Sequence, residues 1–534
     1  MKFIIITGGV ISGIGKGVSA ASIGFFLSEK YKIIPIKLDG YLNVDPGTMN
    51  PKEHGEVFVL EDGAEVDMDF GHYERFLGQN SNRSQSITMG KIFKDVLERE
   101  RQGDYLGQTV QLIPHVTNFI QDKIKEVTKN TKTDICIIEI GGTVGDIENE
   151  LFIEAIRQMR LKEKKKDFLH IHLTYAPIPA GVKEQKTKPT QQSINLLHAK
   201  GLFPDFVFVR GEIPLTNENK AKIALFSNLE KHQIISVPDV DNIYKIPEIL
   251  AKQNFDTLML KHFGIKERFD KKLKQWGDII KKEKNKSLII GIIGKYTGLE
   301  DSYSSVVEAL RHSGFQLGVD IKICFFDARK EIDTKKIKAL DGIIVPGGFG
   351  TSGIEEMIRI LEFTRKNKIP SLGICLGLQL MIIEFTRNVL GVKNANSKEF
   401  DEKTKAPIIT LLDSQANIIN KGGTMRLGAQ RSILKKGKIF DLYKTGERIG
   451  KDDSISERFR HRYEVNPEFV KSLNEKGLYI SGISEKEGIV QFIELDKKNH
   501  PYFVGTQSHP ELTSRLENPA PLFMGLITAC LKNK

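Results

Sequence analysis

One cysteine of this chain stands in a setting typical of an enzymatic nucleophile. Residues 371–379 read Ser-Leu-Gly-Ile-Cys-Leu-Gly-Leu-Gln, an apolar strand that enters a helix through Gly-x-Cys-x-Gly with Cys375 at its centre. The flanking glycines permit a sharp turn that presents the thiol, and the N-terminus of the following helix favours the thiolate. A buried structural cysteine is the alternative, and it suits Cys136, Cys324 and Cys530 better than Cys375.

A base and an oxyanion site for this thiol are present elsewhere in the sequence. Residues 506–511 read Thr-Gln-Ser-His-Pro-Glu, where His509 would transfer the proton and Glu511 would orient its imidazole, as in a triad. Residues 346–350, Pro-Gly-Gly-Phe-Gly, would offer free backbone N–H groups to the oxyanion of a tetrahedral intermediate, with the N–H of Leu376 as the second donor. The pattern predicts nucleophilic catalysis at a carbonyl carbon.

The first residues of the chain predict a phosphate-binding loop. An apolar run, Phe3–Thr7, leads into Gly-Gly-Val-Ile-Ser-Gly-Ile-Gly-Lys-Gly-Val at residues 8–18, and a helical stretch, Ser19–Glu29, follows. Glycines let backbone N–H groups converge on phosphate oxygens, and Lys16 adds a full positive charge. A simple glycine turn between strand and helix is the alternative. Gly17 stands where a Walker A loop has the Ser or Thr that binds Mg²⁺.

Oxygen ligands for a metal on these phosphates must therefore come from other segments. Two segments offer carboxylates: residues 65–72, Glu-Val-Asp-Met-Asp-Phe-Gly-His, and Glu139 at the end of a predicted strand before Gly141-Gly142. Ligands of open parallel sheets bind at such strand ends. A second cationic cluster, Lys183–Gln191, follows another predicted strand, and it is either a further phosphate contact or the solvated start of a helix.

Both halves of the chain alternate β-rich apolar runs with helical stretches, which predicts an α/β fold with parallel sheets. The expected strands of the first half are Phe3–Thr7, Ile33–Leu38, Asp134–Ile140, Leu169–Thr174, Phe206–Val209 and Ile234–Val237. Those of the second half are Leu288–Ile293, Ile321–Phe326, Gly342–Pro346 and Ser371–Cys375. The Lys-rich stretch 255–286 is expected to be a helix and a linker. We expect two domains, 1–265 and 288–534, joined by a linker at 266–287.

The composition excludes several classes of protein. The chain has 534 residues, of which 40% are hydrophobic and 28% charged, so it is neither fibrous nor wholly disordered. Four scattered cysteines fit neither a zinc site nor a disulfide framework, and no apolar run reaches the roughly 20 residues of a membrane span, so a cytoplasmic protein is expected. The net charge of +11 is spread along the chain rather than gathered in a patch, which argues against nucleic-acid binding.

These residues carry a resemblance that covers nearly the whole chain. The second half resembles a class I glutamine amidotransferase domain, and the first half looks like the synthetase domain of the CTP synthase family. The motifs that carry the resemblance are Leu42–Met49, His54–Val59, Gly71–Phe76, Glu139–Glu148, Lys186–Gln191 and Gly422–Gly428, in addition to the cysteine, histidine and phosphate-loop segments. The fold implied is two α/β domains, a P-loop-like synthetase and a class I glutaminase.

The resemblance implies roles for individual residues. ATP would contact Gly13, Ile14, Gly15, Lys16, Gly17, Val18 and Asp69, with Val240 beside the adenine, and Mg²⁺ would bind to Asp69 and Glu139. UTP, and inhibitory CTP at an overlapping site, would contact Ser12, Asp146, Ile147, Glu148, Lys186, Thr187, Lys188, Pro189, Thr190, Gln191 and Lys222. Glutamine would contact Gly348, Cys375, Leu376, Gln379, Glu399 and Arg462, with Arg460 as the alternative arginine. His509 and Glu511 would complete the triad, and Gly422–Gly428 would be the lid through which GTP activates the glutaminase.

The activity implied is amination of UTP to CTP, driven by ATP and fed with ammonia from glutamine. Because ammonium is a poor nucleophile, ammonia would need an internal passage. A homotetramer is also implied. Three other classes remain open at this stage: an amidotransferase ligase with another acceptor, such as a GMP-synthase-like or cobyrinate-type enzyme; a non-catalytic nucleotide switch or filament scaffold; and a nucleic-acid binder, suggested by the charge alone.

Overall fold

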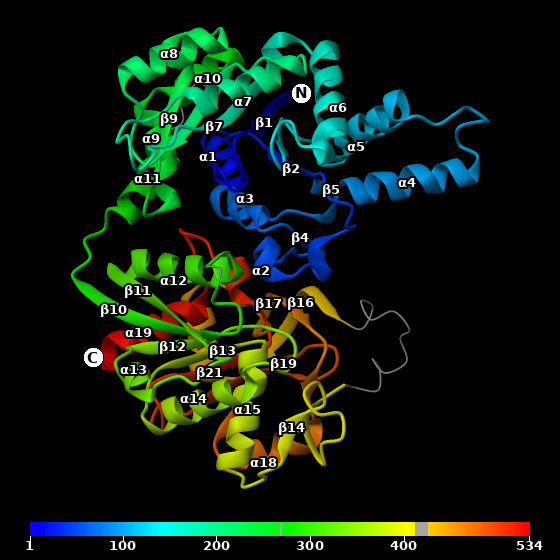
Figure 1. The fold of residues 1–534 in the computed structure, drawn as a ribbon. Helices are drawn as coiled ribbons and strands as arrows, with labels where there is room; N and C mark the ends of the chain where they lie inside the picture. The colour runs from blue at the N-terminus through cyan, green and yellow to red at the C-terminus, as the bar shows by residue number, and fades with distance from the viewer. Residues whose placement is uncertain (267–269, 299, 412–424, 534) are drawn as a thin grey trace. The chain divides into compact units, whose positions relative to one another are not determined.

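The computed structural model describes residues 1–266, 270–298, 300–411 and 425–533 (Figure 1). These residues form two compact units. The first comprises Met1–Pro46 and Asp69–Ile280, and the second comprises Gly47–Met68 and Lys281–Lys534. Both have the predicted α/β architecture. No helix in these ranges is long and apolar enough to cross a membrane.

The first unit is built on a parallel sheet whose strand order is β5-β2-β6-β1-β7-β8-β9. Its strands are β1 (Lys2–Gly8), β2 (Ile33–Asp39), β5 (Ser86–Thr88), β6 (Ile135–Ile140), β7 (Phe168–Tyr175), β8 (Phe206–Gly211) and β9 (Ile234–Pro238). The central strands are continuous runs of Ile, Phe and Val, as expected for strands covered by helices on both faces. The six strands predicted from the sequence are present within two residues at each end, and only the short edge strand β5 was not anticipated.

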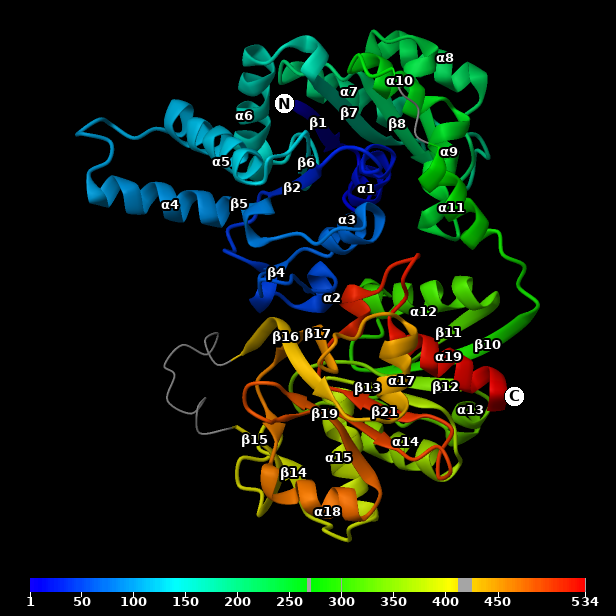
Figure 2. The same ribbon diagram turned by 180° about the vertical axis from the view of Figure 1, so that it is seen from behind.

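Helices of the first unit follow the strands as crossover connections (Figure 2). They are α1 (Lys16–Leu27), α3 (Asp69–Leu77), α4 (Met89–Gln102), α5 (Thr117–Asn130), α6 (Glu150–Lys162), α7 (Lys188–Ala199), α8 (Asn217–Ser227), α9 (Ile246–Lys252), α10 (Phe255–His262) and α11 (Lys271–Ile280). In both ribbon views α4 and α5 extend away from the sheet as a pair. The carboxyl ends of β1, β2 and β6 meet at one edge, which gathers the residues that follow them.

The second unit has a mixed sheet with the strand order β11-β10-β12-β13-β21-β20-β19-β16-β17. The strands β11 (Val319–Asp327), β10 (Lys286–Gly294), β12 (Gly342–Val345), β13 (Ser371–Ile374) and β21 (Phe503–Thr506) pair in parallel. The strands β20 (Val490–Leu495), β19 (Leu478–Ser484), β16 (Arg426–Leu434) and β17 (Ser454–His461) continue the sheet antiparallel. The sequence patterns predicted β10 to β13, and they predicted neither β21 nor the antiparallel continuation.

The remaining elements of the second unit cover this sheet or extend its rim. The helices are α12 (Ser304–Leu317), α13 (Thr334–Lys338), α14 (Ile354–Lys366), α15 (Leu376–Asn388), α17 (Lys438–Thr445), α18 (Val470–Glu475) and α19 (Pro521–Asn533). A small sheet contains β14 (Ala395–Ser397), β15 (Ala406–Thr410) and β18 (Glu464–Val465). Residues 47–68 form α2 (Pro51–His54) and the pair β3 (Phe58–Val59) and β4 (Glu65–Val66).

Residues 47–68 belong to the second unit although they lie within the first half of the chain. Arg458 donates a hydrogen bond to the carbonyl of Val59 at 3.0 Å, and Arg460 Nε donates to Glu65 Oε1 at 2.7 Å. The Glu56 carboxylate accepts from the backbone N–H of Ser305 at 3.0 Å. No local pattern in the sequence indicated that residues 47–68 would pack with the second unit. Their hydrogen-bond partners lie some 250 to 400 residues further along the chain.

Helix α11 lies inside the stretch expected to be a linker, and it packs on the first unit. Trp276, the sole tryptophan, is 1% exposed. Its ring lies 4.4 Å from that of Phe25, 5.1 Å from that of Phe76 and 5.4 Å from that of Tyr244, measured between centroids. The aromatic cluster therefore ties the end of the first unit to α1 and α3.

We expect Trp276→Ala to lower the free energy of unfolding of the first unit by about 3–5 kcal/mol, because it removes a large buried ring. Urea denaturation followed by circular dichroism measures the loss. Trp276→Phe keeps an aromatic ring and serves as the control, with a smaller expected loss. An unchanged denaturation midpoint for Trp276→Ala would show that α11 does not stabilise this unit.

Candidate functional site

The phosphate loop adopts the predicted strand–loop–helix geometry. It leaves β1 after Gly8, and α1 begins at Lys16, with Gly15 as the N-cap residue in the left-handed region. Lys16 is 7% exposed, and its Nζ donates to the carbonyl of Gly142 at 2.7 Å. Burial lowers the pKa of Lys16, while the nearby charge of Glu139 opposes the shift. The loop thus places a poorly solvated cation at the carboxyl edge of the sheet.

Gly17 has a steric reason to be glycine. A Cβ at this position would lie 1.9 Å from Oδ1 of Asp69. The Asp69 carboxylate therefore occupies the space where a Walker A hydroxyl would project. The sequence departs from the standard loop at the very position where the structure brings in an acidic side chain from α3.

Asp69 and Glu139 are joined by a buried lysine that the sequence analysis did not select. Lys37, in the middle of β2, is 4% exposed; its Nζ donates to Glu139 Oε1 at 3.1 Å and also to Asp69 Oδ2. Tyr73 of α3 donates its hydroxyl to the other oxygen of Glu139. A charged residue inside the apolar run Ile33–Leu38 was a signal that could have found Lys37, since buried charges require partners.

The two carboxyl groups are held at different pKa values. Burial and the charge of Asp69 raise the pKa of Glu139 to about 7, against the opposite influence of Lys37 and Lys16. Burial would also raise the pKa of Asp69, but the charges of Lys37 and His72 outweigh it and hold that pKa below its usual range. A further positive charge near Glu139, such as a metal ion, would favour the ionised form of its carboxyl group.

These residues fit a magnesium site. Mg²⁺ in phosphate-transfer sites takes one or two carboxylates and completes its shell with phosphate oxygens and water. Asp69 and Glu139 supply two carboxylates that share Lys37, and the opening at Gly17 lets one of them reach the phosphate loop. In the described part of the chain no group of three or more His, Cys, Asp or Glu side chains has the geometry of a self-contained metal site. The donor set therefore suits an ion that needs phosphates as well.

A pocket of about 120 Å³ opens beside the phosphate loop. Ile14, Gly15 and Val18 line one part of it and Val240 lies in its wall, as expected for the adenine end of a nucleotide. Arg210, which the sequence analysis missed, also lines this pocket. It donates to the carbonyl of Gly13 at 3.0 Å and to Asp239 at 2.7 Å, and so connects the loop to the end of β9.

The residues expected to bind the pyrimidine nucleotide fall into two groups. Ser12, Ile147, Glu148, Lys188 and Lys222 are exposed. Thr187, Thr190 and Gln191 are buried and bonded within the unit, as in the bond from Gln191 to Thr187 at 3.1 Å and from Thr190 to the carbonyl of Tyr175 at 3.1 Å. Asp146 accepts from the backbone N–H of Thr143, and Pro189 lies in the first turn of α7.

Two lysines of this set are brought to one carboxylate. Lys186 Nζ lies 2.9 Å from Glu184 Oε2. The hydrogen bond from Lys186, together with the charges of Lys186 and Lys222, lowers the pKa of Glu184. The charge of Lys222 from α8 thus acts on the same carboxylate as Lys186, and both the phosphate-contact interpretation and the solvated helix start remain predictions.

In the second unit Cys375 has the strained backbone of a nucleophile elbow. It lies between β13 and α15 with φ 53° and ψ −100°, and its N–H donates to the carbonyl of Thr506 at 2.7 Å. A Cβ on Gly377 would lie 2.1 Å from the carbonyl oxygen of Val345, and one on Gly373 would lie 2.6 Å from Gly377. Close approach of the backbone therefore explains both glycines of the motif.

His509 and Glu511 form the expected dyad. His509 Nδ1 lies 2.7 Å from Glu511 Oε1, while the buried Nε2 has no hydrogen-bond partner among the described residues. Burial by itself would lower the pKa of His509, but the negative charges of Glu511 and of the Cys375 thiolate raise it to about 10. At neutral pH the imidazole is therefore protonated, and it can donate a proton to a leaving group next to Cys375.

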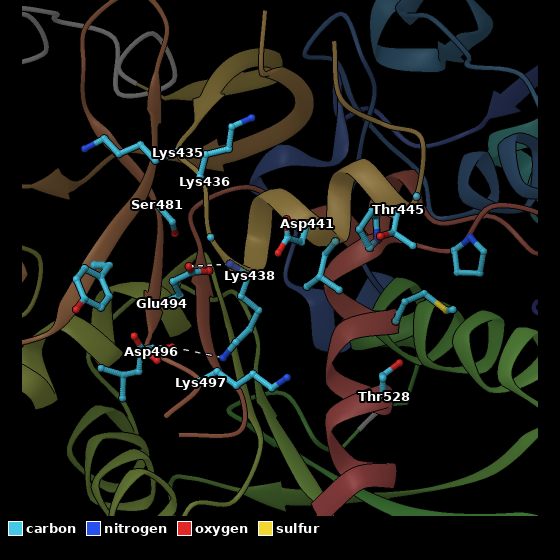
Figure 3. Close-up of a pocket in the computed structure, with 18 of the residues that line it drawn as sticks. Lys435, Lys436, Lys438, Asp441, Thr445, Ser481, Glu494, Asp496, Lys497 and Thr528 are labelled. Atoms are coloured by element: carbon cyan, nitrogen blue, oxygen red, sulfur yellow. Dashed lines mark hydrogen bonds between the residues drawn. The ribbon is translucent and has the colours of Figure 1, made fainter. Parts of the chain in front are cut away.

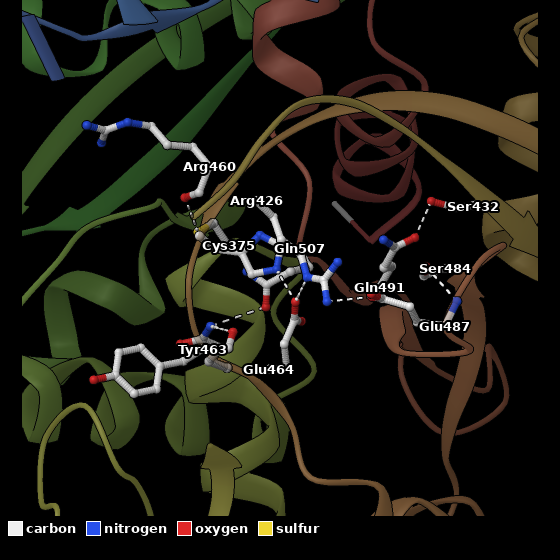
Figure 4. Close-up of polar contacts among 12 residues, drawn as sticks. Cys375, Arg426, Ser432, Arg460, Tyr463, Glu464, Ser484, Glu487, Gln491 and Gln507 are labelled. Carbon is white, nitrogen blue, oxygen red and sulfur yellow. Dashed lines mark hydrogen bonds and ion pairs between the residues drawn. The ribbon is translucent and has the colours of Figure 1, made fainter. Parts of the chain in front are cut away.

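A cavity of about 500 Å³ collects the residues expected to bind glutamine. Its walls include all of them: Gly348, Cys375, Leu376, Gln379, Glu399, Arg462, His509 and Glu511, and also Arg460. Figure 4 shows polar contacts of residues near Cys375, among them Tyr463 and Gln507. Gln379 donates to the carbonyl of Tyr463 at 3.0 Å and to Gln507 at 3.2 Å. Cys375 Sγ contacts the carbonyl of Arg460 at 3.6 Å.

The two candidate arginines differ in their surroundings. The guanidinium of Arg460 is paired with Glu65 and lies 5.0 Å from the centre of the Phe349 ring. Burial raises the pKa of Glu399, and the charge of Arg462 is among the influences that oppose the shift. Both arginines line the cavity, so either could meet a substrate carboxylate. Residues 422–424 of the expected lid lie outside the described residues, and Met425 lines the cavity.

A larger cavity of about 1370 Å³ in the same unit contains none of the expected site residues (Figure 3). Five lysines and five carboxylates line it: Lys435, Lys436, Lys438, Lys497, Lys532, Asp441, Glu447, Glu494, Asp496 and Glu517. Glu494 accepts the backbone N–H groups of Lys438 and Ile439 at the start of α17. The balanced charges give this cavity no preference for an anion or a cation.

We expect Glu511→Gln to lower the pKa of His509 from about 10 by more than one unit, because the amide keeps the hydrogen bond but removes a negative charge. Folded protein would then lose the imidazolium at a lower pH, and with it the stability that the charged pair contributes below that pKa. An NMR titration of the histidines measures the change, and His509→Asn identifies the resonance. An unchanged pKa would mean that Glu511 does not set the charge of His509.

Comparisons with known proteins show similarity over the whole chain. A family described as "CTP synthase N-terminus" matches residues 2–265, and one described as "Glutamine amidotransferase class-I" matches residues 299–529. A CTP synthase of Borreliella burgdorferi is 49% identical over 99% of both chains, and one of Bacillus subtilis is 46% identical over the same shares. The structure titled "Trypanosoma brucei CTPS - glutaminase domain with bound acivicin" is 32% identical over 46% of this chain and 94% of its own, with a TM-score of 0.42.

Proposed function

The chain belongs to the CTP synthase family, and on this premise we propose how its residues divide the reaction between the two units. The reaction is the ATP-dependent amination of UTP to CTP with ammonia taken from glutamine. We assign glutamine hydrolysis to the second unit and nucleotide chemistry to the first. The observation that carries the assignment is the meeting of Cys375, His509 and Glu511 in one cavity.

Glutamine hydrolysis begins with attack of the Cys375 thiolate on the side-chain carboxamide carbon. Backbone N–H groups of the loop Pro346–Gly350 and of Leu376 stabilise the oxyanion. His509, protonated at neutral pH, gives its proton to the departing ammonia, and a glutamyl thioester remains. Neutral His509 then accepts a proton from water as the water attacks the thioester, which releases glutamate and restores the thiolate–imidazolium pair.

Recognition of glutamine follows from the charges around the cavity. Arg462 binds the α-carboxylate and Glu399 the α-ammonium group, as both side chains line the cavity and carry the complementary charges. Both amide protons of Gln379 are donated to Tyr463 and Gln507, so its carbonyl oxygen is left to accept an N–H of the substrate. The cavity thus matches an α-amino acid with a side-chain amide.

In the first unit Lys16 and Lys37 stabilise the phosphoryl group that moves from ATP to O4 of UTP. Asp69 and Glu139 would hold Mg²⁺, which when bound supplies neutralising charge to the phosphate oxygens. Ammonia then attacks C4 of the pyrimidine and phosphate leaves, giving CTP. The adenine lies against Val240, and the cations near residues 186 and 222 bind the phosphates of UTP.

Regulation and assembly follow from the same family. We propose that GTP activates glutamine hydrolysis through the segment that ends at Gly428, and that CTP inhibits by binding over the UTP site. We also propose a homotetramer, and the pair α4 and α5 is the surface we assign to self-association. Leu97, Leu106 and Leu112 at this projection are 63%, 89% and 55% exposed, which is unusual for apolar side chains unless another chain covers them.

We expect Cys375→Ala to abolish CTP formation from glutamine, a loss of at least about a thousandfold, because the covalent step has no substitute nucleophile. CTP formation from added ammonium chloride should persist, since it bypasses the thioester. Absorbance at the pyrimidine band measures both rates. Lys16→Ala is the matched variant for the other unit and should lose both activities. Loss of both activities in Cys375→Ala would instead make the cysteine structural.

We expect Gly17→Ala to reduce CTP formation from either nitrogen donor by more than about tenfold, because the new Cβ displaces Asp69 from the phosphate loop. Basal glutamine hydrolysis should be unchanged, as it uses only the second unit. Gly298→Ala is the control, since a Cβ there meets nothing within 4 Å. Normal ammonia-dependent turnover in Gly17→Ala would contradict the placement of Asp69 at the phosphates.

A further inference from the structure

A buried lysine behind the glutamine cavity contacts the loop expected to form the oxyanion site. Lys295 follows β10 and is 2% exposed. Its Nζ donates to the carbonyl of Phe349 at 3.1 Å and to the carbonyl of Gly350. On the cavity side, the Glu399 carboxylate accepts the backbone N–H of Gly350 at 3.0 Å. Lys295 and Glu399 therefore bind the same short stretch of backbone.

The two contacts act on a single peptide plane. The carbonyl of Phe349 and the N–H of Gly350 belong to one peptide unit, which is planar and trans, so they point in opposite directions. Lys295 binds one end of this unit and Glu399 binds the other. Rotation of the plane would break at least one charge-assisted hydrogen bond, and such bonds are roughly twice as strong as neutral ones.

This restraint acts on a loop that is rich in glycine. Three of its five residues are glycines, which have the largest conformational freedom to lose. An added Cβ on Gly347 would lie 2.8 Å from Cε1 of His509, whereas one on Gly348 would come no closer than 3.5 Å to any neighbour, so steric restraint is weaker towards the end of the loop that Lys295 and Glu399 bind. Oxyanion donors contribute most when they are oriented before the charge develops. We propose that Lys295 is a positioning residue, which orients the N–H groups of the loop Pro346–Gly350 through the 349–350 peptide plane.

The position of Lys295 argues against a direct role in substrate binding. It is absent from the residues that line the glutamine cavity in the described ranges, whereas its neighbour Tyr296 is present. Burial lowers the pKa of Lys295 to about 8 while the charge of Glu399 opposes the shift, so the ammonium persists at neutral pH. Its ammonium group donates to two backbone carbonyl oxygens, and its charge also acts on Glu399.

The test rests on the proposed glutaminase function and compares Lys295→Met with Lys295→Arg in the full-length enzyme. Lys295→Met removes the donors at nearly constant volume, and Lys295→Arg keeps a cation that can donate to two carbonyls. Lys471→Met is the matched control, because Lys471 is 87% exposed and pairs with Glu475 on the surface of α18. The readouts are kcat and KM for glutamine hydrolysis, together with ammonia-dependent CTP formation as the measure of an intact fold.

We expect Lys295→Met to lower kcat for glutamine hydrolysis by about 10- to 100-fold, with a smaller change in KM, because the loop acts as the oxyanion develops. Lys295→Arg should recover most of this loss, and ammonia-dependent turnover should stay within about twofold of the unmodified enzyme. An unchanged kcat, a rise in KM alone, or an equal loss of both activities in both variants would overturn the inference. If the unmodified enzyme did not hydrolyse glutamine, the proposed function itself would fail, which is a separate result.

Discussion

The pairing of buried charges is the constraint on which the nucleotide-binding half of this enzyme depends. Lys37 is buried on β2 of a parallel sheet, and its desolvation is tolerable because the carboxylates of Asp39, Asp69 and Glu139 surround its ammonium group. Asp69 and Glu139 come from α3 and β6, so the pairing fixes how those elements meet β2. The same carboxylates then stand beside the phosphate loop, because Gly17 leaves room for Asp69. Stability and site geometry have a common origin in this cluster.

The glutaminase half depends instead on close packing of the backbone around Cys375. The elbow at Cys375 brings the backbone of α15 against β12 so tightly that glycine is required on both sides of the nucleophile. That approach places the thiol next to His509, whose charge is maintained by Glu511. The neighbouring loop has no such packing at Gly348, and there Lys295 and Glu399 replace steric restraint with hydrogen bonds. The glutaminase site therefore orients its reacting groups by tight backbone packing at the cysteine elbow and by hydrogen bonds at the neighbouring loop.

Most strands, and the motifs that follow them, could be predicted from the sequence because each leaves a pattern within a short segment of the chain. Continuous apolar runs predicted β1, β2, β6 to β9 and β10 to β13, and glycine-rich connections predicted the phosphate loop and the cysteine elbow. Sequence reasoning missed Lys37, Arg210, Lys295 and Gln507, since each acts through partners distant in the chain. The antiparallel strands β16, β17, β19 and β20 were also missed, because their alternating residues carry a weaker signal than buried parallel strands.

The identity of the reacting groups was readable in the order of the residues, since a thiol between glycines or a lysine after a glycine loop has few other uses. Their arrangement was not. The membership of residues 47–68 in the second unit, the choice of Asp69 to fill the space at Gly17, and the protonation of His509 all arise from long-range contacts. The burial and electrostatic environment of a side chain depend on every segment that packs around it. A sequence motif contains information on its own segment alone.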